Sequence, residues 1–182
     1  MNKASAIAAE IDKQIEILHR CRSVFPRLDN SLVGQTEFRA PGYYQQLGLD
    51  VSVKLSSPMT AEFIDGLFDL GHWINENFVV RLWSILESNG IKTVNQELDN
   101  WRDVELVRRL RNKIGHGSGN YDPNDKDKKK LFDSIVDYYK VPQGYSYFDV
   151  EKYPIGIKQV LVPMAHGCKT YAAAYLAVKK GG

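Results

Sequence analysis

The sequence has little of what marks membrane, secreted or disordered chains. Its 182 residues include only two cysteines, Cys21 and Cys168, which form neither a CxxC pair nor a disulfide framework, a usage that suits a reducing cytosol. No run approaches the ~20 apolar residues of a membrane span, and the N-terminus lacks the apolar core of a signal peptide. The sequence therefore predicts a cytoplasmic protein with no membrane partner.

Neither sign of charge dominates the composition. The chain has 24 Lys and Arg against 22 Asp and Glu, for a net charge of +2. This surplus is smaller than that of a dedicated nucleic-acid-binding domain, so charge alone indicates no partner. A hydrophobic content of 43% and an aromatic content of 11% exclude a disordered chain. At about 150 residues per domain, residues 1–182 are predicted to form one domain.

Apolar residues recur every three or four positions in five segments, a spacing typical of amphipathic helices. The predicted helices cover residues from about 7 to 25, 57 to 88, 100 to 114, 131 to 139 and 157 to 180, the last kinked at Pro163. Residues 26–57 form an irregular insertion, in which alternation from Leu49 to Leu55 predicts one short strand or an extended arm. The predicted fold class is an all-α, up-and-down bundle of about five helices.

The third predicted helix carries an unusual arginine. At 100° per residue, Val104, Val107, Leu110 and Ile114 form an apolar stripe, and Arg111 lies on the same side. An arginine in this position needs a charged partner or a function. A salt bridge to a carboxylate of the preceding long helix, such as Glu76, is one interpretation.

Asn112 and His116 lie four residues apart on the neighbouring polar face of this helix, beside Glu105 and Arg109. The segment Arg111-Asn-Lys-Ile-Gly-His116 therefore resembles the R-N-x-x-x-H motif of the HEPN superfamily (higher eukaryotes and prokaryotes nucleotide-binding). Chance supplies about 0.2 Arg–His pairs at this spacing, and Asn in second place lowers that to about 0.01. The long helix before the motif also resembles that of bacterial members, and the resemblance covers residues 57–180.

The resemblance implies a helical bundle that forms a homodimer, with two motifs facing each other across the interface. It also implies a metal-independent endoribonuclease, in which His116 is the general acid/base and Arg111 stabilises the transition-state phosphate. Asn112 would orient the histidine or the phosphate. The chemistry is plausible in itself, because a histidine with a pKa near 6.5 can both accept and donate a proton at neutral pH.

Residues around the motif are predicted to contact RNA. Gly117, Ser118 and Gly119 would let a phosphate backbone approach closely, although a plain helix C-cap explains such glycines as well. The lysine-rich run at 126–130 is either a solvated helix start or an RNA-binding rim. The candidate RNA-binding residues are Arg108, Lys113, Ser118, Lys128 and Lys129.

No metal or cofactor is expected. His166 and Cys168 are two possible metal ligands, but no second pair with zinc spacing accompanies them. The predicted function is cleavage of single-stranded or loop RNA, in a toxin or defence effector whose further partner would be an antitoxin protein. Two alternatives stay open: a non-catalytic HEPN module that binds RNA, a nucleotide or a partner protein, and a helical interaction protein in which the motif is structural.

Overall fold

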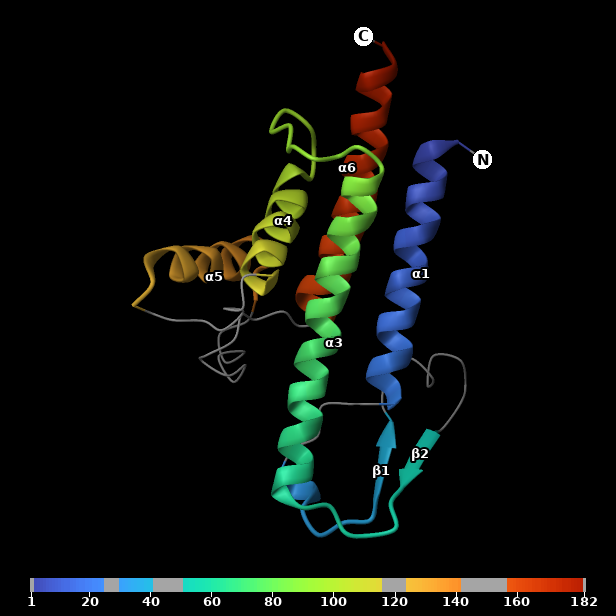
Figure 1. Cartoon of the computed structure of the whole chain (residues 1–182), viewed down its shortest axis with the longest axis vertical. Coiled ribbons are helices and arrows are strands. Elements are labelled where there is room, and N and C mark those ends of the chain that lie inside the picture. The colour runs from blue at the N-terminus through green and yellow to red at the C-terminus, as the bar shows by residue number, and fades with distance from the viewer. Residues whose placement is uncertain (1, 25–29, 41–50, 116–123, 142–156, 182) are drawn as a thin grey trace. The chain divides into compact units, whose positions relative to one another are not determined.

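The computed structural model describes residues 2–24, 30–40, 51–115, 124–141 and 157–181. Five α-helices and a two-stranded sheet occupy these ranges (Figure 1). The helices are α1 (Lys3–Val24), α3 (Ala61–Ser88), α4 (Trp101–Gly115), α5 (Lys126–Tyr139) and α6 (Val162–Gly181). The shorter elements are η1 (Asn30–Leu32), β1 (Glu37–Ala40), β2 (Val51–Lys54) and the π-helical η3 (Ile157–Leu161). The predicted all-α bundle of about five helices is therefore confirmed, with a short sheet added.

The chain divides into two compact units. One unit comprises residues 1–14 and 78–182, and the other comprises residues 15–77. The boundary runs through α1 and α3, so each of these helices contributes to both units. The single domain over residues 1–182 stays a prediction.

The unit of residues 15–77 has its own small core around the sheet. β1 pairs antiparallel with β2, and Phe38 lies opposite Val53. Both side chains join one apolar cluster, whose other members are Met59, Ile64, Leu32, Leu55, Leu67 and Phe68. The alternation of apolar and polar residues around Val53 thus corresponds to a half-buried strand, as predicted from the sequence. The partner strand β1 was missed, because Phe38 is the only large apolar residue in its four positions.

The helix α3 starts later than its sequence pattern suggests. The predicted start near residue 57 is too early: the Thr60 Oγ1 accepts a hydrogen bond from the Phe63 amide at 3.1 Å and caps the first turn. Phe63 continues the apolar spacing of this helix but is 40% exposed, and the neighbouring Ile64 is buried instead. The expected end is confirmed. Gly90 adopts a φ of +89°, and Gly90 and Ile91 donate to Glu87 and Leu86 in a Schellman motif.

The last helical segment changes geometry at Pro163, where a kink was expected. Residues 157–161 form a π-helical turn, and α-helix follows from Val162. Proline lacks the N–H that would continue a regular hydrogen-bond ladder, which accounts for the irregular geometry just before it. Among the described helices, none is both long and apolar enough to cross a membrane.

The core of the larger unit is centred on α4, which packs against α6 and α5. Val104, Val107 and Leu110 are buried, as the apolar stripe predicts. Asp103 is buried with them and lies against Gly167 of α6, where a Cβ atom would sit 2.2 Å from the Asp103 Oδ2 atom. The absence of a side chain at Gly167 therefore lets α6 approach the Asp103 side chain closely.

A pair of glycine substitutions tests this close approach. Gly167→Ala should lower the free energy of unfolding by about 1–3 kcal/mol, because the new methyl group overlaps the Asp103 side chain. Gly66→Ala in α3 is the matched control, since its Cβ would have no neighbour within 4 Å. It should raise stability by about 0.5–1 kcal/mol through helix propensity. Urea denaturation of both variants checks the difference, and equal effects would contradict this account of α4–α6 packing.

Candidate functional site

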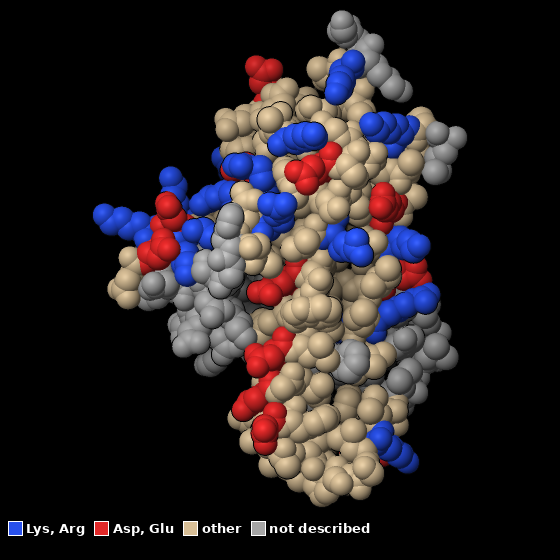
Figure 2. All heavy atoms as spheres, in the orientation of Figure 1, with Lys and Arg blue, Asp and Glu red and all other residues tan. Residues whose placement is uncertain are grey.

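The helix α4 combines a buried face with a strongly polar one. Its buried residues follow the helical repeat and include one carboxylate, Asp103. On the other face are four cationic side chains and Asn112, and the cations are Arg102, Arg108, Arg109 and Lys113. Figure 2 shows Lys and Arg gathered over α4 and α5, with some acidic residues among them. The helix thus carries a basic surface.

Two tyrosines of α5 satisfy the buried carboxylate. The Tyr138 Oη donates to the Asp103 Oδ2 at 2.8 Å, and the Tyr139 Oη donates to the Oδ1 at 2.6 Å. Burial nevertheless raises the pKa of Asp103 above its ordinary 3.8, because the charged form is poorly solvated. Burial, together with the Asp103 hydrogen bond and charge, raises the pKa of Tyr138 to about 12 and also raises that of Tyr139.

Cys168 of α6 is a further buried group beside this cluster. Desolvation, helped by the negative charge of Asp103, raises the pKa of its thiol well above the ordinary range. A thiol held neutral is a poor nucleophile and a poor metal ligand. Cys168 therefore serves as a small apolar core residue in this structure.

The structure brings two of the three predicted catalytic residues into contact. The Arg111 guanidinium donates to the Asn112 Oδ1 at 3.1 Å on the last turn of α4. Both side chains are partly exposed, so the remaining guanidinium N–H groups stay close to the protein surface. His116, which follows directly, lies outside the described residues. The suggested pairing of Arg111 with Glu76 stays a prediction, since Glu76 belongs to the other unit.

Four of the five predicted RNA-binding residues belong to the end of α4, the start of α5 or the segment between them. The charge of Lys113 helps to lower the pKa of Asp125 at the start of α5, an effect due first to the Lys128 amide. The end of α4 and the beginning of α5 therefore bring Lys113 and Lys128 near the same carboxylate. Lys129 instead pairs with Asp133 of its own helix at 2.7 Å. Ser118 lies outside the described residues.

The fifth candidate, Arg108, forms two hydrogen bonds with Glu105 one turn earlier, at 2.9 and 2.8 Å. This bidentate pairing raises the pKa of Arg108 and leaves Glu105 with little uncompensated charge. Arg108 therefore neutralises a carboxylate that would otherwise weaken the positive surface of α4.

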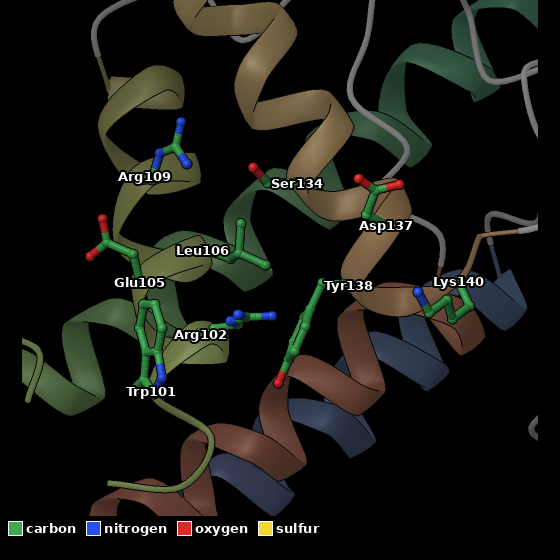
Figure 3. Close-up of a pocket in the computed structure, with 9 residues that line it drawn as sticks. All are labelled: Trp101, Arg102, Glu105, Leu106, Arg109, Ser134, Asp137, Tyr138 and Lys140. Atoms are coloured by element: carbon green, nitrogen blue, oxygen red, sulfur yellow. The ribbon is translucent and has the colours of Figure 1, made fainter. Parts of the chain in front are cut away.

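A groove between α4 and α5 lies on the same polar face and was not predicted from the sequence. It has a volume of about 480 Å³. The lining residues, drawn in Figure 3, are Trp101, Arg102, Glu105, Leu106, Arg109, Ser134, Asp137, Tyr138 and Lys140. In the part of the chain that the structure describes, no group of three or more His, Cys, Asp or Glu side chains could hold a metal ion.

The chain matches no protein-family model, and no curated protein or solved structure is significantly similar to it. The functional argument therefore depends on the residues themselves.

The buried carboxylate gives a prediction about stability and pH. A carboxyl group with a raised folded-state pKa contributes stability that is present below its ordinary pKa of 3.8 and lost as pH rises through the raised pKa. Asp103→Asn cannot ionise, so its stability relative to the wild type should increase over that rise in pH. Urea denaturation at a series of pH values measures this difference.

Two further variants complete the test. Asp103→Ala leaves two tyrosine hydroxyls without their acceptor and should cost about 2–4 kcal/mol. Asp99→Asn removes an equivalent but exposed charge and should change little. A stability difference between Asp103→Asn and the wild type that did not vary with pH would show that the buried carboxyl does not titrate as argued.

Proposed function

We propose that this protein is a metal-independent endoribonuclease of the HEPN type that cleaves single-stranded or loop RNA. The observation that carries the proposal is the hydrogen bond between Arg111 and Asn112 on the partly exposed last turn of α4. These two residues directly precede the Lys-Ile-Gly-His116 part of the motif in the sequence. Asn112 lies on the basic face of the helix, which suits a polyanionic substrate.

Each residue of the motif has a distinct role in the proposed reaction. His116 accepts the proton of a ribose 2′-OH, which attacks the adjacent phosphorus, and donates a proton to the departing 5′-oxygen. The Arg111 guanidinium stabilises the negative charge that accumulates on the phosphoryl oxygens. Asn112, which accepts a hydrogen bond from Arg111, orients that guanidinium. The products are a 2′,3′-cyclic phosphate, or its opened form, and a 5′-hydroxyl.

A non-catalytic module that binds RNA or a nucleotide is the second candidate. The groove beside Trp101 and Tyr138 favours it, because aromatic rings and cations line the groove together. Both candidates fit a homodimer, and a toxin or defence role would add an antitoxin protein as a partner. Cleavage separates the two candidates.

The cleavage prediction concerns reaction type. Unstructured RNA should be cut in the presence of EDTA, DNA should be inert, and one 2′-deoxy substitution should block cleavage at that position, because the nucleophile is the 2′-OH. Denaturing gels of end-labelled substrates measure these cuts. Cleavage at the deoxy position, or a requirement for added metal, would refute the mechanism.

Substitutions in the motif should separate chemistry from binding. His116→Ala should reduce the cleavage rate by about 10²- to 10⁴-fold, the usual loss on removing a general acid/base, while RNA binding persists. Arg111→Ala should also be severe, whereas Arg81→Ala, an exposed arginine of α3, is the matched control and should cleave normally. RNA binding without cleavage by the wild type would favour the non-catalytic module.

The assembly state is a separate prediction. Analytical ultracentrifugation should show a symmetric dimer, because two copies of the motif at one two-fold axis would form a composite site. A monomer at the concentrations at which RNA is cleaved would remove the composite site from the proposal.

A further inference from the structure

The groove between α4 and α5 presents aromatic and cationic groups together, away from the Arg111–Asn112 pair. The Arg102 guanidinium lies over the Trp101 ring at 5.5 Å and over the Tyr138 ring at 6.0 Å from the ring centroids (Figure 3). Trp101 is only partly buried, so part of its ring surface is accessible from the groove. Flat aromatic surfaces beside arginines are what an unpaired nucleobase and its phosphate require.

The Tyr138 side of this groove is held in place by a buried hydrogen bond. The Tyr138 hydroxyl is committed to the buried Asp103 carboxylate, so the ring cannot swing away without breaking that hydrogen bond. Arg102 lies between Tyr138 and Trp101 and within cation–π distance of both rings (Figure 3). A preorganised aromatic surface loses little conformational entropy when a ligand stacks on it.

The charges of the groove favour an anion. Arg102, Arg109 and Lys140 line it together with two carboxylates, Glu105 and Asp137. Because Arg108 already neutralises Glu105 through two hydrogen bonds, the positive charges are left in excess. The groove therefore matches a ligand that is both aromatic and negatively charged, which is the chemistry of a nucleotide.

The groove and one residue of the motif, Asn112, share one face of α4, whereas Arg111 lies on the side of the apolar stripe. Arg102, Arg109 and Asn112 follow one another at helical spacings of seven and three residues, so their Cα atoms lie along one side of the helix. Arg102 and Asn112 are about 15 Å apart along the helix axis at 1.5 Å per residue. A single RNA strand could therefore contact Asn112 and, a few nucleotides away, the groove.

We infer that this groove binds an unpaired nucleotide of the RNA substrate that flanks the cut site, with its base stacked on Trp101 and its phosphates near Arg102 and Arg109. The inference rests on the proposed function, because the ligand is the same RNA strand. It adds a determinant of substrate choice: unpaired RNA, in which bases are free to stack, is preferred to a duplex.

Binding measured in a catalytically impaired background tests the groove. With fluorescein-labelled oligouridylate and His116→Ala protein, Trp101→Ala should weaken binding about five- to 150-fold, the usual effect of losing a stacked base. Trp101→Phe should restore most of the affinity. Trp73→Ala, which removes a 60% exposed tryptophan of α3, is the matched control and should bind normally.

Two further probes separate stacking from charge. Inorganic polyphosphate has no bases, so its affinity should not depend on Trp101. Arg102→Gln and Arg109→Gln should each reduce the salt dependence of oligouridylate binding, by about 0.7 in the slope of log affinity against log salt. Lys54→Gln, an exposed cation of β2, should leave the slope unchanged. Circular dichroism and thermal unfolding verify that each variant is folded.

The outcomes distinguish this inference from the proposed function. Trp101-dependent binding by a wild-type protein that cleaves nothing would support the groove and refute the nuclease. RNA cleavage and binding that are the same in folded Trp101→Ala, Arg102→Gln and wild-type proteins would refute the groove and leave the nuclease intact. Three further results would overturn the inference. They are an equal loss of affinity for oligouridylate and polyphosphate in Trp101→Ala, no binding of oligouridylate by the wild type, and Trp101-dependent binding of polyglutamate that is as tight as that of oligouridylate. The last result would indicate a protein partner.

Discussion

The surface of α4 depends on one buried carboxylate. Asp103 is 3% exposed and is held by two hydroxyls from α5, while α6 approaches it at a position without a side chain. A buried charge without partners would be strongly destabilising, so α4 can satisfy it in only a narrow range of rotations about its own axis. When α4 is rotated so that Asp103 faces its partners on α5 and α6, the side chains of Arg102, Arg109 and Asn112 lie on the opposite, outer side of the helix. The carboxylate thus orients the basic face without taking part in it.

The helical periodicity predicted the fold class well, because most helices bury one continuous apolar stripe. It did not predict local details that depend on tertiary contacts. Phe63 fits the stripe of α3 and is nevertheless exposed, since the cluster around Phe38 and Met59 buries Ile64 instead. The strand β1 has too few apolar residues to show the alternating pattern from which a strand is predicted. Its pairing with β2 stabilises it as a strand.

The candidate site was predictable only where its residues are neighbours in the sequence. Arg111 and Asn112 form one motif, and the structure joins them by a hydrogen bond. Asp103 and its tyrosines are 35 and 36 residues apart, so no local pattern links them. One signal was available: Asp103 lies four residues before Val107, on the apolar stripe, and a carboxylate there requires buried partners. The groove forms between two helices, α4 and α5, and the sequence of neither helix alone contains a pattern that predicts it.

The central claim is that one face of α4, held by Asp103, carries both the groove and Asn112 of the motif and binds a single RNA strand. Two-dimensional amide NMR of the His116→Ala protein, titrated with oligouridylate, tests it most directly. The account predicts that the Trp101 indole and Asn112 side-chain signals shift together at one RNA concentration, while the Trp73 indole signal stays in place. Shifts confined to residues 15–77, or shifts of Trp101 and Asn112 at clearly different RNA concentrations, would contradict the claim.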